Sequence, residues 1–113
     1  MIIFSMQIVV ADEMRSALQS TLGSMLGPTR ATPGCLGARL YCDLDKRTAL
    51  LLIEEWETRE QFDFNMDKDK LNTLVAAIEL SREAPLIRID RVERTEGVET
   101  LALHRRIDGD GIQ

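Results

Sequence analysis

Histidine, cysteine and aromatic residues are scarce in this 113-residue chain, and that scarcity limits the chemistry it can support. The chain holds one histidine, two cysteines and only 4% aromatic residues. It contains no Ser-His-Asp arrangement, no CxxC pair, no cluster of histidine with carboxylates and no glycine-rich phosphate loop. The sequence therefore gives no support to a hydrolase, a zinc protein or a nucleotide-binding protein.

The two cysteines, Cys35 and Cys42, are not expected to form a disulfide with each other. Both fall on one expected strand, where they would lie roughly 23 Å apart and on opposite faces. A disulfide requires Cα atoms within about 7 Å of each other. We expect two free and mostly buried thiols, which is the usual state of such cysteines.

An excess of positive charge and a long hydrophobic run are also absent. Fourteen lysines and arginines against nineteen acidic residues give a formal net charge of −5, which repels phosphate backbones and predicts no nucleic-acid partner. The apolar residues 1–10 are far fewer than the roughly 20 that span a bilayer, and they lack a basic leader and a cleavage site. We expect a strand there, no membrane partner and a cytoplasmic protein.

The patterns that are present indicate one α+β domain. A helix is expected after Asp12, as its N-cap, and a second, bent or in two pieces, follows the capping box Thr58–Gln61 and ends near Ser81. The expected strands are 2–10, 35–43, 48–57 and 86–94. This order, β-α-β-β-α-β, predicts a ferredoxin-like split βαβ fold with an antiparallel sheet and both helices on one face.

One run of residues predicts how the molecule assembles. Leu50 to Ile53 are consecutive apolar residues on an expected strand, and such a run indicates a strand buried on both faces. Two helices cover only one face of a sheet, so the other face needs a further partner. The simplest partner is a second copy of the same sheet, related by a two-fold axis. We therefore expect a homodimer, a dimeric α+β barrel.

The C-terminal region is expected to lie outside this unit. We divide the chain into a domain of residues 1–96 and a C-terminal segment of residues 97–113. Val98 to His104 are expected to form a fifth, peripheral strand. The rest of the segment, rich in aspartate and glycine, is expected to be a frayed tail.

Three short motifs in register carry a family resemblance. They are Arg30-Ala-Thr-Pro-Gly-Cys35 between helix and strand, Glu54-Glu-Trp56 closing the third strand, and Thr58 with Phe62 at the helix start. Together with the order of elements they resemble the antibiotic-biosynthesis-monooxygenase family of the dimeric α+β barrel superfamily, over about residues 2–94. The resemblance implies a dimer and a pocket between sheet and helices in each subunit. Members include cofactor-independent oxygenases of phenols and quinols, haem-degrading oxygenases, and proteins with no known reaction.

The chain departs from this family on the second helix. The haem-degrading members depend on a histidine there as iron ligand, whereas this chain has Asn65 at or near that position. Its only histidine, His104, falls in the C-terminal segment. Axial ligation of haem iron needs a placed residue, so we expect no haem, no metal and no other cofactor.

Two residues are candidates for a catalytic role. The Asn65 amide would donate to a substrate oxygen and stabilise an enolate or phenolate, or it would simply cap the helix piece that ends near Asp67. Glu54 shares a strand face with Trp56 and is the one carboxylate that we nominate as a general base. Its structural alternative is an ion pair with an arginine, such as Arg39 or Arg88.

Five further residues are candidates for substrate binding: Trp56, Ser5, Gln7, Phe62 and Met66. Trp56 would form an aromatic wall for a planar substrate, or it would only fill core volume. Ser5 lies near a position that the resemblance associates with polar pocket contacts. Ser5 and Gln7 share a strand face, and the alternative for both is the interior of the dimer barrel.

Two functions therefore remain open. The first is a cofactor-independent monooxygenase that oxidises a small aromatic or quinol-like molecule with O2. The second is a non-catalytic, small-ligand-binding or regulatory dimer on the same scaffold, which the missing histidine favours. An open cavity beside Trp56, ending in a carboxylate or an amide, would support the first, and a filled one the second.

Overall fold

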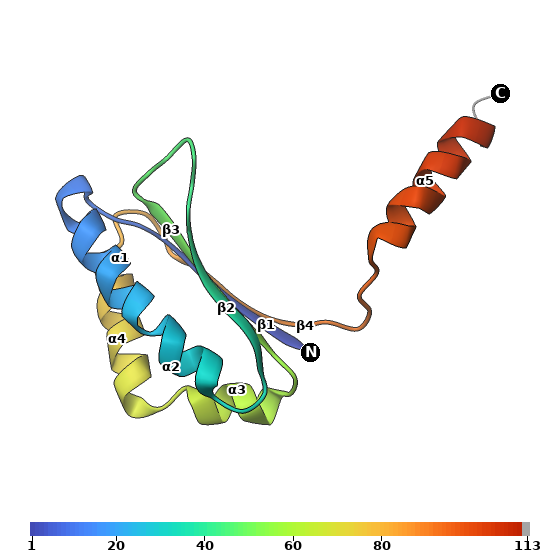
Figure 1. Cartoon of the computed structure of the whole chain (residues 1–113). Coiled ribbons are helices and arrows are strands. Elements are labelled where there is room, and N and C mark those ends of the chain that lie inside the picture. Colours follow the sequence, from blue (N-terminus) through green and yellow to red (C-terminus); the bar gives the residue numbers. More distant parts are fainter. Residues whose placement is uncertain (112–113) are drawn as a thin grey trace.

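Four strands form one antiparallel sheet in the order β2-β3-β1-β4 (Figure 1). The structure is a computed structural model that describes residues 1–111, with side chains described as far as residue 105. The strands are β1 Ile2–Val9, β2 Cys35–Cys42, β3 Ala49–Trp56 and β4 Leu86–Arg91. The central strands β3 and β1 are paired on both edges, so β2 and β4 are the edge strands.

The helices gather on one face of this sheet (Figure 1). They are the 3-10 turn η1 Asp12–Met14, then α1 Arg15–Ser24, α2 Leu26–Ala31, α3 Arg59–Asn65 and α4 Lys68–Glu79. A last helix, α5 Val98–Gly111, stands apart from the others. The order of elements up to β4 confirms the predicted ferredoxin-like α+β fold, with the second helical region in two pieces.

The core lies between the sheet and these helices. Alternate side chains of β1 and β3 point toward the helices and are buried. From the helices, Leu18, Leu22, Phe62 and Leu74 complete the core. Each fully buried aliphatic or aromatic side chain contributes about 1.5–3 kcal/mol, so this interface supplies most of the driving force for folding.

No described element covers the other face of the sheet. The remaining residues of β1 and β3, among them Ser5, Gln7, Leu51 and Ile53, point to this open face and are only partly buried. The apolar run on β3 thus divides between the two faces, as predicted: Leu50 and Leu52 enter the core, while Leu51 and Ile53 remain on the open face.

Local signals set the helix boundaries, although not always at the predicted residue. Asp12 is not an N-cap, because the chain first makes the 3-10 turn that Ala11 precedes. The Thr58 hydroxyl accepts from the Gln61 backbone N–H at 3.2 Å, as predicted, but the Gln61 side-chain oxygen is buried without a partner and does not complete the capping box. Asp67 caps α4 by accepting from the Lys70 backbone N–H.

The predicted fifth strand is wrong: the segment from Val98 is the helix α5. Side-chain hydrogen bonds close its first turn, since the Glu99 carboxylate accepts from the Gly97 N–H at 2.8 Å and the Thr100 hydroxyl donates to Glu96 at 2.6 Å. Such local bonds favour a helix start over an extended chain. The predicted frayed tail is also wrong as far as Gly111, where α5 ends, and its last two residues, 112–113, lie outside the described residues.

The two cysteines are free, but the expectation that both are mostly buried is wrong for one of them. Cys35 is half-buried against the core, whereas Cys42 is exposed at the end of β2. Its thiol donates to the Arg47 carbonyl at 3.1 Å. Cys42 is the last residue of β2, where the strand passes into the polar hairpin, so its side chain does not pack in the core.

Candidate functional site

A buried carboxylate organises the polar cluster between β3 and the helices. Glu54 points toward the helices from β3 and is only 1% exposed. Its Oε1 accepts from the Trp56 indole Nε1 at 3.1 Å and from the Asn65 amide Nδ2 at 3.4 Å. The spacing on β3 places Glu54 and Trp56 on one face, and the end of α3 brings Asn65 to the same carboxylate.

Lys70 supplies the positive charge that this carboxylate needs. Its ammonium lies 2.7 Å from Glu54 Oε2 and donates to Asn65 Oδ1 and Thr29 Oγ1, both at 3.1 Å. It also lies 6.0 Å from the centre of the Trp56 ring, a distance at which an aromatic face attracts a cation. A buried charge is stable only when it is paired and hydrogen-bonded, and both ions here meet that condition.

The network fixes the orientation of the Asn65 amide. Its oxygen faces the Lys70 ammonium and its NH2 group faces the Glu54 carboxylate. The flipped amide would place donor against donor and acceptor against acceptor. An NH2 group has two hydrogens, and the one that Glu54 does not accept is available to another oxygen.

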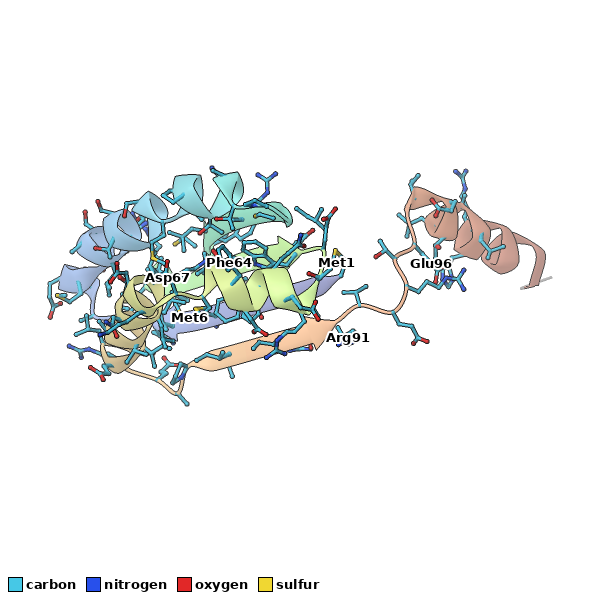
Figure 2. All side chains as sticks on the ribbon, turned by 90° about the horizontal axis from the view of Figure 1, so that it is seen from below. Met1, Met6, Phe64, Asp67, Arg91 and Glu96 are labelled. Atoms are coloured by element: carbon cyan, nitrogen blue, oxygen red, sulfur yellow. The ribbon has the colours of Figure 1, made fainter. Side chains whose placement is uncertain are left out.

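A cleft of about 350 Å³ lies beside this network, between α1 and α2 on one side and the start of α4 on the other. Thr29 and Asn65, which are buried, and Lys70, whose side chain is 9% exposed, form the floor. Phe64 and Asp67 stand at the exposed rim, and Figure 2 shows both at the junction of α3 and α4. The remaining lining residues are Ser24, Met25, Pro28, Thr32, Asp69 and Thr73. The cleft therefore has a polar, cationic floor beneath a partly apolar entrance.

The structure brings together three of the residues predicted for the site, namely Glu54, Trp56 and Asn65. Only Asn65 lines the cleft. Glu54 lies behind it, and Trp56 is 0% exposed in the core with its indole N–H bound to Glu54. The volume beside Trp56 is therefore filled. The open space is the cleft on the far side of Asn65 and Lys70 from Trp56.

The other predicted binding residues lie elsewhere. Phe62 is buried with its ring 5.5 Å from that of Phe4, and Met66 packs at the margin of the core. Ser5 and Gln7 alternate with the core residues of β1 and therefore point to the open face, away from Glu54. The sheet separates them from the buried network.

Sequence reasoning assigned the wrong partner to Glu54 and missed two residues of the network. An arginine such as Arg39 or Arg88 was expected, but the partner is Lys70, because both arginines alternate onto the open face. Lys70 is the third residue of the helix that Asp67 caps, a position that turns it inward with the core face of α4. The spacing of Lys70 with Leu74 and Ala77 on one helix face could have predicted that this lysine points inward. For Thr29, on a short helix, no sequence pattern predicted burial.

Cys35 borders the same region, next to Trp56 across the β2–β3 pair. Burial raises the pKa of the Cys35 thiol above its ordinary value, and the nearby Glu54 carboxylate adds to the rise. The Gly37 backbone and the charges of Lys70 and Arg30 act in the opposite direction. The thiol is thus held in its protonated, less reactive form.

Within residues 1–105, whose side chains the structure describes, no group of histidine, cysteine and acidic side chains is arranged to hold a metal ion. Over residues 1–111, no helix has both the length and the apolar composition needed to cross a membrane. The polar network of Glu54 and Lys70 is satisfied by side chains of the chain itself.

Comparison with known proteins agrees with the fold. The sequence model described as antibiotic biosynthesis monooxygenase matches residues 1–77. Rv0793 of Mycobacterium tuberculosis is similar in structure, with 25% identity and a TM-score of 0.74, over 85% of this chain and 98% of that one. None of the curated proteins matches the chain significantly.

Two structures with lower sequence identity share the fold. A putative antibiotic biosynthesis monooxygenase from Deinococcus radiodurans has 18% identity and a TM-score of 0.76, over 86% of this chain and 97% of that one. SnoaB from Streptomyces nogalater, a cofactor-independent oxygenase solved as an asparagine-to-alanine variant, has 17% identity and a TM-score of 0.69, over 83% of this chain and 94% of that one.

Proposed function

The chain belongs to the antibiotic biosynthesis monooxygenase family, and on that premise we propose that it is a cofactor-independent monooxygenase acting on a small phenolic or quinol-like molecule. The observation that supports this most is the cleft whose floor combines the oriented Asn65 amide with the Lys70 ammonium. Both groups favour a negatively charged oxygen. The name of one similar structure, a cofactor-independent oxygenase, supports the same reaction type.

In this proposal the substrate supplies the electrons and the protein supplies the environment. The phenolic oxygen binds at the floor of the cleft, where the free Asn65 N–H and the Lys70 charge stabilise its deprotonated form. At a substrate carbon that carries two hydrogens, one atom of O2 becomes a carbonyl oxygen and the other leaves as water with those hydrogens. The electron-rich phenolate makes that carbon able to reduce O2.

Glu54 acts in this scheme as a positioning residue. It does not line the cleft, and its carboxylate is held by Lys70, Trp56 and Asn65. A direct role as general base would require it to leave these partners and reach past Asn65. We therefore assign to Glu54 the orientation of Asn65 and Lys70.

A second candidate function is supported by the filled volume around Trp56. A planar substrate cannot stack on a ring that is 0% exposed, and the two carboxylates that line the cleft, Asp67 and Asp69, belong to exposed residues and not to its buried floor. These features favour a small-ligand-binding dimer without turnover. In both functions the ligand class is the same, a small aromatic molecule with an acidic hydroxyl.

We also propose that the protein is a homodimer paired through its open sheet faces. The partly buried apolar residues Leu51 and Ile53 on that face support this pairing, since they have no cover within the described chain. The pairing would place Ser5 and Gln7 inside the barrel between the sheets.

Oxygen consumption tests the proposed reaction. A panel of quinols and tautomerising phenols is supplied with air and the protein, without added metal or cofactor, in an oxygen electrode. We expect uptake that depends on the protein and is lost in Asn65→Ala, while Leu44→Ala, on the exposed hairpin outside the cleft, retains it. Binding of panel members without any uptake would support the second function instead.

A further inference from the structure

Within the described residues, the helix α5 makes no extensive packing contact with any other helix or strand. It stands away from the sheet domain at the end of an extended linker (Figures 1 and 2). Its apolar side chains Val98, Leu101 and Leu103 are between 54 and 78% exposed. The radius of gyration is 17.5 Å, against about 13 Å for a compact chain of this length. With 14 residues, α5 has about the length at which an isolated helix is marginal in water, so a surface that covers its apolar side chains would stabilise it.

The same chain offers an uncovered apolar surface of matching size. On β4, Ile87 and Ile89 are paired with Met6 and Phe4 and so lie on the helix side of the sheet, yet they are 46 and 43% exposed. They are exposed because α1 and α2 cover the β2 side and no helix lies over the β4 edge.

One flank of α4 continues this surface. Thr73, Ala76 and Leu80 form the flank of α4 that lines a groove with α1. At 100° per residue, Leu71 and Val75 lie on the opposite flank, facing the β4 side, and they are 48 and 41% exposed. We call Leu71, Val75, Ile87 and Ile89 the α4–β4 surface.

We propose that α5 of each chain packs on the α4–β4 surface of a second copy. The lengths agree: α5 is about 21 Å long at helical rise, and β4 is about 20 Å long at strand rise. The charges agree as well, since Arg91 shares the helix side of β4 with Ile87 and Ile89, and Glu99 lies in the first turn of α5. The apolar side chains of α5 and of the α4–β4 surface then cover each other.

The path of the chain after β4 favours binding of α5 to the α4–β4 surface of a second copy over binding to the same surface of its own chain. Beyond Arg91 the strand direction continues, because the Val92 N–H donates to the Met1 carbonyl at 2.9 Å. Residues 93–97 then run without a hydrogen-bonded turn and carry α5 beyond the end of the sheet, as Figure 2 shows between Arg91 and Glu96. Exchange of such a terminal element between identical chains is a low-cost route to a dimer.

Disulfide trapping between differently tagged copies tests this packing. In a background of Cys35→Ser and Cys42→Ser, one copy carries Leu101→Cys and the other Ile89→Cys; the two are mixed and oxidised. We expect a covalent heterodimer on a non-reducing gel. The control replaces Leu101→Cys by Leu44→Cys, a hairpin residue that is 98% exposed, and should give only background crosslinking. A yield no higher than this control would overturn the proposal.

A double variant with both cysteines in one chain identifies the alternative. An intramolecular disulfide at the monomer mass, with no heterodimer in the mixed sample, would show that α5 binds its own domain and would also overturn the proposal.

The natural sequence provides a second measurement that does not depend on cysteine replacement. Removal of residues 97–113 should raise the dissociation constant of the dimer by about tenfold or more in sedimentation, and an unchanged constant would contradict the exchange.

Discussion

Among single residues, Glu54 and Lys70 carry the largest energetic consequences, because each is a charge removed from water. The pair is 2.7 Å apart, and the side chains are 1 and 9% exposed. Lys46 and Glu83 form an ion pair as well, but both side chains are about half exposed to solvent. The two pairs share their chemistry and differ in burial, which makes one a control for the other.

Lys70→Met should lower the free energy of unfolding by about 3–5 kcal/mol, since it leaves Glu54 buried without its counter-ion. Lys46→Met should cost less than about 1 kcal/mol, the usual contribution of an exposed pair. Urea denaturation of both variants measures the difference. If the two substitutions cost the same, the buried network does not have the importance that we assign to it.

The two thiols should differ in reactivity as a consequence of the raised pKa of Cys35. Because the thiolate is the nucleophile, a raised pKa lowers the reactive fraction at a given pH, and the alkylation rate of Cys35 should still be rising with pH beyond 9.0, the ordinary thiol value, where that of an unshifted thiol levels off. Iodoacetamide rates against pH, measured on Cys42→Ser and Cys35→Ser, test this. Faster reaction of Cys35 than of the exposed Cys42 at neutral pH would contradict it.

At the level of the elements, the turn into β2 depends on one glycine. Gly34 has a φ of +89°, and a Cβ added there would lie 2.1 Å from the Gln61 side chain. Gly34→Ala should therefore destabilise the protein by at least about 1–2 kcal/mol, the cost of a left-handed conformation with a side chain. Gly37→Ala is the matched control, because a Cβ at that position would meet no other atom within 4 Å. Thermal unfolding of the two variants should separate them; equal midpoints would speak against strain at Gly34.

Most elements could be predicted from the sequence because their signals are local. Alternation on residues 2–9, helical spacing from Met14 to Met25 and the Thr58 cap each act within a few residues. The C-terminal helix was missed because Val98 to His104 is too short a segment for periodicity to separate strand from helix. The side-chain hydrogen bonds of Glu96 and Glu99 favour the helix over the strand, and the sequence alone does not reveal them.

The candidate site was only partly predictable. Strand alternation was sufficient to place Glu54 beside Trp56, and helix position was sufficient to point Asn65 toward the core. The pairing with Lys70 depends on how far α4 sits over the sheet, which no local pattern determines. The position of the cleft was unpredictable for the same reason, because it depends on the packing of α2 against the α3–α4 junction.

At the scale of the whole molecule, the open face of the sheet predicts association. Light scattering should give twice the chain mass of 12.8 kDa at micromolar concentration. Leu51→Glu should shift the mass to that of one chain without unfolding it, since a carboxylate between Gln7 and Tyr41 on the open face meets water in the monomer and loses that water in the dimer. Leu44→Glu, on the exposed hairpin, is the control. A native protein of 12.8 kDa would contradict the dimer.

The fate of oxygen atoms tests the proposed reaction most directly. A panel member that supports oxygen uptake is incubated with the protein under isotopically labelled O2, and the product is analysed by mass spectrometry. The proposed reaction predicts one labelled oxygen atom per product molecule with the native protein, and loss of product with Asn65→Ala although that variant remains folded. A product without label, or equal labelled product from native protein and Asn65→Ala, would contradict a monooxygenase that works through the floor of this cleft.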